Sequence, residues 1–566
     1  MEGNEERNKQ IVDYLNQKMD EIDKEYPQLN VRTRATRALD KVLESKGSFE
    51  EIKSKLDNTL NKMISEYKEK IKEKEEEEKA ARSAFDKAME GNIIATSSEY
   101  YFGQTYSTPL IEVFEKYEEI KNSSLTDEEK KNKFNDEYKV LLSVLKQKYR
   151  ASISSQIKDD IMRGEFNGKK EDPLLYIMTG LFRGFDSLNY DIVSKLYNIF
   201  VNDINVVSTD FDNDMKFCIN GSEAVYVLPD NTYYPNENYF DFSRLMRLFK
   251  FAKKHNKKIR LHSLFSNILI PEAFVAAIKK LPDDKIFEFG SAFLSDYLKN
   301  LSDALKKENI VLDQIDVFSN LTEEENFWFK TVDATDNGYD YYVDILKLTR
   351  TFFPDTKLIV NVDNECLDYV CASFCKIVQR IRAVERNENI KLIDGIGLSS
   401  HITEFLEYYG RELKGKDLYD TMLQYVKLDL PIYRTEFDYK AMDDSNKKEI
   451  LDIIQYIDGK CGVRGFVLCG NNDLLTTKSG EFNNVSMIDK DGNPKEEYVS
   501  FKKKYTKRVD NQPEILTFTE DENPGGNPTV IKYSTDNKGA VSAVFMLGIM
   551  MVVLVALIVA AFMLIN

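Results

Sequence analysis

Tryptophan, histidine and cysteine are scarce in this chain of 566 residues, which contains one tryptophan, three histidines and six cysteines. The cysteines do not form a spaced disulfide framework, and no histidine lies near enough to them in the sequence to suggest a zinc site. We therefore expect buried free thiols, no metal and no other cofactor. The six are Cys218, Cys366, Cys371, Cys375, Cys461 and Cys469.

A basic stripe is also missing. Lysine and arginine total 78 against 95 aspartates and glutamates, which gives a formal net charge of −17. A nucleic-acid-binding protein concentrates basic residues on one face, so this balance argues against nucleic acid as a partner. No glycine-rich phosphate turn follows an early strand, and this absence argues against a doubly wound open sheet.

Residues 1–26 contain no apolar core of the kind that a secretory signal needs. Residues 540–565 are the opposite, because they carry no charge and exceed the roughly 20 residues that cross a bilayer. A buried helix of a soluble protein would show a polar face there, and this segment shows none. We expect a single C-terminal transmembrane helix that anchors the protein in a membrane, with the bulk of the chain in the cytosol.

Residues 1–165 are rich in charge and have a helical pattern. Apolar residues recur at spacings of three and four within residues 52–71, which indicates a narrow apolar stripe on one helix. Residues 72–82 continue this helix with a solvated charged run. The stripe suits either a helical hairpin within the chain or a short coiled coil through which the protein self-associates. Its members are Ile52, Leu56, Leu60, Met63, Tyr67 and Ile71.

The pattern changes at about Leu174, where short apolar runs begin to alternate with amphipathic helical segments. Eight such runs, most of them followed by a helix, predict a (β/α)8 TIM barrel of the α/β class over residues 174–505. The Pro/Gly/Asn-rich residues 506–539 are expected to be a linker to residues 540–565. The eight expected strands lie within residues 174–182, 204–212, 257–265, 311–319, 356–362, 393–401, 430–438 and 462–470.

Polar residues stand where these strands end, and a barrel of this kind assembles its active site at the carboxyl ends of its strands. Two of the three histidines fall there, together with a glutamate that ends the apolar strand LPIYRTEFD. Each histidine alone is more often structural, but the combination favours a site. The residues are Asp212, Asn213, Lys216, His262, Ser319, Asn320, Asn361, Asn364, His401, Glu436, Cys469, Asn472 and Asp473.

Six segments in collinear order resemble glycoside hydrolase family 10, the retaining endo-β-1,4-xylanases. DFDNDMKF (210–217) resembles the family's Glu-Asn-x-Met-Lys segment, and IDGIGLSSHI (393–402) resembles Asp-Gly-Ile-Gly-Leu-Gln-Ser-His. IYRTEFD (432–438) resembles the nucleophile strand Ile-Thr-Glu-Leu-Asp, and IDKDGNPKEEY (488–498) the closing Pro-Lys-x-x-Tyr. The other two are FDFSRLMRLFKFAKKHNKKIRLHSL (240–264), which resembles a helix and strand, and IDVFSN (315–320).

The resemblance implies a retaining site, in which two carboxyl groups stand about 5–5.5 Å apart, one as nucleophile and one as acid/base. It implies that Glu436 is the nucleophile and that His401 hydrogen-bonds and orients it. The residues that it implies for sugar contacts are Asp212, Asn213, Lys216, His262 and Asn361.

The acid/base position departs from the family pattern. IDVFSN corresponds to Trp-Asp-Val-Val-Asn-Glu, which places Asn320 at the glutamate. An amide cannot protonate a departing alkoxide or deprotonate water at neutral pH. Glu323, Glu324 and Glu325 follow and could bend back, although a solvated loop is the ordinary interpretation of this run.

Three functions therefore stay open, and so does the question whether the protein is an enzyme. We expect a membrane-anchored family-10-like protein that has kept its nucleophile, hydrolyses weakly or not at all, and binds a β-glycan or oligosaccharide. One alternative is an active endo-1,4-β-xylanase-type glycosidase that uses another acid. The other is a tail-anchored scaffold. The loss of sugar-stacking indoles favours weak catalysis, because Ser266 and Cys469 stand at their positions and Ser399 replaces a glutamine.

Overall fold

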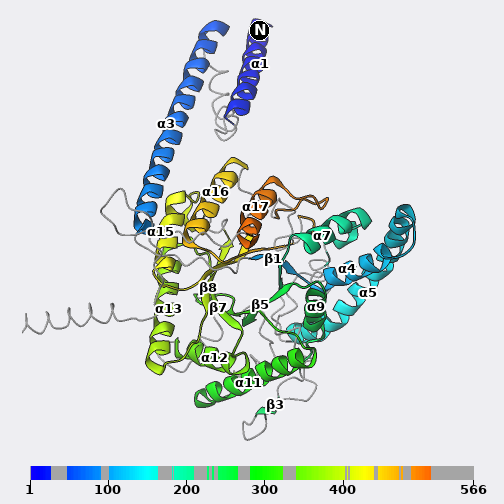
Figure 1. Cartoon of the computed structure of the whole chain (residues 1–566). Helices are drawn as coiled ribbons and strands as arrows, with labels where there is room; N and C mark the ends of the chain where they lie inside the picture. The colour runs from blue at the N-terminus through cyan, green and yellow to red at the C-terminus, as the bar shows by residue number, and fades with distance from the viewer. Residues whose placement is uncertain are drawn as a thin grey trace, which may run out of the picture. The chain divides into compact units, whose positions relative to one another are not determined.

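The computed structural model is shown in Figure 1. The residues that it describes are 2–26, 47–90, 101–162, 182, 184–209, 226–227, 233–234, 240–265, 281–322, 339–401, 405, 408–438, 444–470, 473–475 and 486–510.

Within these described residues, eight parallel strands form a closed barrel, so the predicted (β/α)8 barrel is confirmed. Each strand is hydrogen-bonded to two neighbours, which leaves the barrel without an edge. The order around the barrel is β1 (Tyr101–Tyr106), β10 (Gly465–Leu468), β9 (Ile432–Asp438), β8 (Gly395–His401), β7 (Lys357–Asp363), β6 (Gln314–Phe318), β5 (Lys258–Phe265) and β2 (Val206–Thr209). A separate antiparallel pair joins β3 (Tyr226–Val227) and β4 (Tyr233–Tyr234).

The first strand of the barrel lies earlier in the chain than the sequence predicts. It is β1, which lies inside residues 1–165, where we expected only helices, and it pairs with both β10 and β2. These pairings close the barrel, so its first strand begins at Tyr101 rather than at residue 174. The strand expected at 174–182 lies outside the described residues except for Phe182. All six residues of β1 are buried, so its sequence shows no alternation of apolar and polar residues.

Amphipathic helices surround the strands, and the main hydrophobic core lies between the helices and the outer faces of the strands. Local signals explain individual ends: the Asn189 side chain caps α7 by accepting hydrogen bonds from the backbone of Asp191 and Ile192. The helices are α4 (Thr108–Lys121), α5 (Asp127–Met162), α7 (Tyr190–Asn202), α9 (Ser243–Lys254), α11 (Asp283–Lys307), α12 (Tyr339–Phe352), α13 (Asp368–Glu388), α15 (Gly415–Val426), α16 (Asp444–Cys461) and α17 (Glu496–Asp510).

The inside of the barrel is closed by a small cluster of Tyr101, Val206, Ile359 and Tyr433. A Cβ on Gly465 would lie 2.9 Å from the Tyr101 ring, so this glycine provides the space that the ring occupies. The Tyr101 hydroxyl donates a 2.7 Å hydrogen bond to the Gln314 side chain. Inside the barrel, the aromatic cluster thus adjoins polar side chains, beginning with Gln314.

The predicted N-terminal helical region is confirmed in α1 (Glu2–Glu25) and α3 (Phe49–Glu90). Their apolar side chains form one cluster, in which Leu56 and Leu60 of α3 are covered by α1 of the same chain. This packing supports the hairpin alternative and gives no support to self-association. Further along α3, the Glu78 carboxylate accepts a 2.6 Å hydrogen bond from the backbone N–H of Gly415, the first residue of α15.

Replacing Leu56 and Leu60 by aspartate should separate α1 from α3 and leave the barrel's thermal transition nearly unchanged. Burial of each leucine side chain stabilises the packing of α1 on α3 by about 1.5–3 kcal/mol. The new carboxylates would be buried between the two helices without a partner, which is unfavourable. The separation of α1 from α3 would be measured as faster hydrogen exchange across residues 2–25. The matched control is the double change Lys55→Asp and Thr59→Asp at exposed neighbours on α3. A lower mass in light scattering would instead show that these leucines join two copies.

No helix in the described residues is long and apolar enough to span a membrane. The helix predicted at 540–565 lies outside those residues and stays a prediction. Part of the linker expected at 506–539 is helical instead, since α17 continues to Asp510. The remainder of that linker lies outside the described residues.

Candidate active site

Glu436 reaches the inside of the barrel because β9 contains a bulge. Leu398 of β8 pairs with Arg434, but the next residue, Ser399, pairs with Glu436, so Thr435 is the extra residue. In a regular strand, residues 434 and 436 would point to the same side. Here Arg434 contacts a helix outside the barrel, whereas Glu436 points inward. The bulge therefore aims the carboxylate at the centre.

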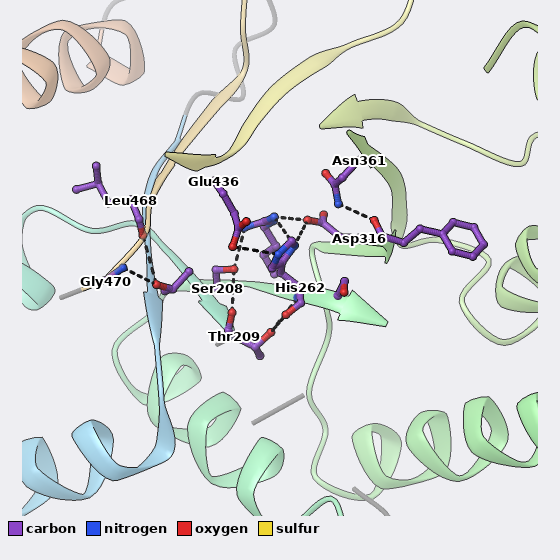
Figure 2. A network of polar contacts seen from close by, with 12 residues as sticks. Ser208, Thr209, His262, Asp316, Asn361, Glu436, Leu468 and Gly470 are labelled. Carbon is purple, nitrogen blue, oxygen red and sulfur yellow. Dashed lines mark hydrogen bonds and ion pairs between the residues drawn. The ribbon is translucent and has the colours of Figure 1, made fainter. Parts of the chain in front are cut away.

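His262, near the end of β5, meets this carboxylate. Its Nε2 lies 3.2 Å from Glu436 Oε1, and its Nδ1 lies 2.8 Å from Asp316 Oδ2 (Figure 2). The backbone of His262 is fixed by the Thr209 hydroxyl, which accepts from its N–H and donates to its carbonyl oxygen, both at 2.8 Å. The imidazole is thus held between two carboxylates.

Arg260 supplies the second positive charge of this cluster. It contacts the same oxygen of Asp316 that His262 contacts, and its Nη1 donates a 2.8 Å hydrogen bond to Ser208 Oγ. Asp316 is fully buried on β6, where its other oxygen accepts a 2.9 Å hydrogen bond from Gln314. Two cations and two carboxylates therefore balance inside the barrel.

The pKa values of the cluster follow from this pairing. Burial and the nearby Arg260 charge would lower the pKa of His262, but the negative charge of Glu436 and the hydrogen bond to Asp316 outweigh both and raise the pKa to about 9. Burial alone would likewise raise the pKa of Asp316, but the Arg260 and His262 charges hold it well below its usual range. At neutral pH His262 is therefore a cation that forms ion pairs with both Asp316 and Glu436.

The structure places Asn320 in a local turn. Its side-chain oxygen accepts hydrogen bonds from both the backbone N–H and the hydroxyl of Thr322, each at 2.9 Å. The neighbouring Ser319 is tied through its backbone N–H to the Phe265 carbonyl oxygen at 3.1 Å. The amide at the implied acid/base position is therefore engaged with its own loop.

Asn361 lies below the rim rather than on it. It is fully buried, its amide nitrogen donates a 2.9 Å hydrogen bond to the Phe318 carbonyl oxygen, and a Cβ on Gly397 would come within 1.7 Å of its Oδ1. The amide thus fills the space beside that glycine. A sugar contact by Asn361 stays a prediction.

Other expected site residues are only partly described. His401 ends β8 with its backbone paired to Asp438. Cys469 donates its backbone N–H to the Phe437 carbonyl oxygen at 3.1 Å, and Asp473 pairs with Lys495 at 2.7 Å. The His401 side chain and four residues lie outside the described part of the chain, namely Asp212, Asn213, Lys216 and Asn472.

Sequence reasoning missed Arg260 and Asp316, the two most deeply buried charges of the cluster. Arg260 precedes His262 by two residues and so shares its side of β5, and Asp316 is the register partner of His262 on β6. A charged residue inside an otherwise apolar strand was the available signal. Within the described residues, no group of three or more His, Cys, Asp or Glu side chains could hold a metal ion.

A second carboxylate lies in the same layer as Glu436. Asp363, the last residue of β7, is the register partner of Ser399, which in turn pairs with Glu436. Two strand spacings of about 4.8 Å separate the two backbones. Ser399, which lies between them in the register, is fully buried.

The family model of glycosyl hydrolase family 10 matches residues 195–504, which is more than half of the chain. The chain belongs to glycosyl hydrolase family 10. The match begins at residue 195, so β1, α4 and α5 lie before it, and a strand outside the matched segment closes this family-10 barrel.

Solved structures similar to this family-10 chain include xylanase 10B from Thermotoga petrophila in complex with xylobiose, at 17% identity and a TM-score of 0.43, covering 56% of this chain and 90% of that one. Native xylanase 10B from Thermotoga maritima has 17% identity and a TM-score of 0.42, covering 58% and 94%. A Thermobacillus composti GH10 xylanase has 19% identity and a TM-score of 0.40, covering 57% and 99%. No curated protein matches the chain.

Proposed function

We propose that this family-10 barrel binds a β-linked glycan or oligosaccharide at the carboxyl ends of its strands and has lost efficient hydrolysis. One asymmetry carries the proposal. Glu436 is held inside the barrel by His262 at 3.2 Å, whereas Asn320, at the implied acid/base position, has its amide tied to Thr322.

The chemistry of a retaining glycosidase explains why this asymmetry matters. In the first step the nucleophile attacks the anomeric carbon while the acid protonates the leaving oxygen. In the second step that acid, now deprotonated, acts as the base that activates water. A natural glycan leaves as an alkoxide and needs that proton. Asn320 can neither give a proton in the first step nor take one in the second, so an intact nucleophile alone does not sustain turnover.

An activated glycoside tests the nucleophile separately from the acid. Dinitrophenolate leaves without a proton, so the Glu436 carboxylate should attack the anomeric carbon of dinitrophenyl β-xylobioside and displace dinitrophenolate. The xylobiosyl group should then remain as an ester on Glu436. Xylobiose is a suitable first sugar, because xylanase 10B from Thermotoga petrophila was solved in complex with it. The expected result is one xylobiosyl group on the peptide that contains Glu436, measured by mass spectrometry of the digested protein.

Glu436→Gln should abolish this labelling, while the same change at the surface residue Glu449 should leave it intact. Label on another peptide would contradict the assignment of the nucleophile. No label together with no detectable binding of xylo-oligosaccharides would contradict glycan binding and favour the scaffold alternative.

A working glycosidase that uses another acid is the second candidate, and one observation favours it: Asp363 occupies the layer of Glu436, two strands away. Sustained hydrolysis of unactivated xylotetraose, lost on Asp363→Asn, would establish it. Glu324, the alternative acid that the sequence offers, lies outside the described residues.

Membrane attachment belongs to the proposal on the strength of the sequence alone. Residues 540–565 contain no charge and are long enough to cross a bilayer. We propose that they anchor the barrel, which would face the cytosol.

A further inference from the structure

Arg434 stands two residues before Glu436 on β9 and points to the opposite side of the sheet. Its guanidinium is buried against α16, where Nε lies 2.9 Å from Asp458 Oδ2 and Nη2 lies 2.6 Å from Oδ1. Asp458 is itself fully buried. This two-pronged contact has the geometry of the strongest arginine–carboxylate pairs.

The remaining nitrogen of Arg434 reaches across two neighbouring strands. Nη1 donates to Glu365 Oε1 at 3.0 Å and to the hydroxyl of Ser400, which donates to the same Glu365 oxygen. Ser400 belongs to β8, and Glu365 follows β7, where the Tyr425 hydroxyl of α15 donates to its carbonyl oxygen at 3.0 Å. One side chain thus links β9 to β8, to the turn after β7 and to α16.

These contacts hold β9 at its bulge. The register shifts between the pairs Leu398–Arg434 and Ser399–Glu436, so the bulge lies between the guanidinium outside the barrel and the carboxylate inside it. A bulge interrupts the ladder of backbone hydrogen bonds and bends the strand. Side-chain contacts on both sides must therefore fix the strand here, with Asp458 outside and His262 inside.

A buried arginine is a costly way to fill this position. The strand otherwise resembles Ile-Thr-Glu-Leu-Asp, in which an isoleucine stands where Arg434 is. Burying one cation with two carboxylates is often no more stabilising than a well-packed apolar side chain. The number of elements that the guanidinium joins favours a role in geometry over one in stability.

We infer that Arg434 is a positioning residue: its contacts with Asp458, Ser400 and Glu365 set the bulge of β9 and thereby the direction in which Glu436 points. Near an active site a displacement of about 1 Å can cost about 100-fold in rate. The geometric part of this inference does not depend on the bound ligand. Only its consequence for labelling rests on the proposed function.

Arg434→Lys tests the inference, because lysine keeps the charge and loses the two-pronged contact. His262 is the reporter, since its Nε2 touches Glu436 and its pKa is raised by that carboxylate, whereas Asp316 and Arg260 face its other side. Histidine-selective NMR on the full chain resolves it readily among three histidines. Glu436→Gln supplies the value expected when the carboxylate charge is gone.

We expect Arg434→Lys to lower the pKa of His262 by about 1 or more, toward that of Glu436→Gln. Labelling of Glu436 should slow by about tenfold or more, in the maximal rate rather than in the binding of the glycoside. Arg350→Lys is the control: Arg350 pairs with Asp394 at 2.6 Å before β8, at the other end of the barrel. Arg350→Lys should lower the melting temperature without changing the pKa of His262.

A folded Arg434→Lys variant with an unchanged His262 titration would overturn the inference, even if it melted earlier. If that variant does not fold, Ser400→Ala is the second test, because it removes a single hydroxyl of the same network. It should also lower the pKa of His262. A shifted titration in a protein that never labels would uphold the positioning role and contradict the proposed function alone.

Discussion

Under the proposed function, Asn320→Glu should convert a protein that reacts only once into a catalyst, raising the rate at which the Glu436 adduct breaks down by about 10²–10⁴-fold. The new carboxylate would supply the base that water needs in the second step and, when protonated, the acid that an alkoxide needs in the first. Hydrolysis of unactivated xylotetraose should appear together with the faster breakdown. Release of xylobiose from the labelled protein measures the effect.

Asn320→Gln is the matched control, because it has the length of glutamate and cannot exchange a proton. It also tests whether simply freeing the side chain from its contacts with Thr322 has any effect. Equal rates for the glutamate and glutamine variants would contradict the assignment of position 320 as the acid/base site. Asp363 would then become the first residue to examine.

Asp316→Asn should lower the free energy of unfolding by about 3–5 kcal/mol, since it leaves two buried cations without their carboxylate. Arg260 and His262 both contact Asp316 Oδ2, and an amide offers them no charge. Urea unfolding near neutral pH measures the loss. The control Asp420→Asn, at an exposed aspartate of α15 that pairs with Lys416 of the same helix, should change stability little.

The same variant should alter how stability depends on pH. The pKa of folded His262 is about 9, above its ordinary value of 6.5, so its proton contributes stability that is fully present below pH 6.5. That contribution is lost as the pH rises through about 9. Without Asp316 the folded pKa should fall, and the loss should occur at lower pH. An identical pH profile in both proteins would contradict the assignment of His262 as a cation.

Seven of the eight strands were predictable from the sequence, because strands of a parallel barrel are buried on both faces and appear as apolar runs between turns. β1 was not, since YFGQTY stands alone between helical segments and contains a glycine and a glutamine. Gly103 is explained only by the structure, in which a Cβ would lie 3.1–3.2 Å from side chains of Val206 and Val467.

The site was predictable where a polar residue ends a strand. Glu436 and His262 were identified in this way, and the structure brings them together. Arg260 and Asp316 were missed, because their pairing depends on the register between β5 and β6. The bulge that turns Glu436 inward was equally hidden, since no residue of IYRTEFD marks it.

The measurement that tests the central claim most directly is the release of dinitrophenolate from dinitrophenyl β-xylobioside, followed with time on the full chain. A working nucleophile without a base predicts a burst of one dinitrophenolate per chain, followed by almost no further release, and no burst with Glu436→Gln. Steady release over many turnovers would show that the protein retains an acid/base, and no release at all would show that Glu436 is not a nucleophile.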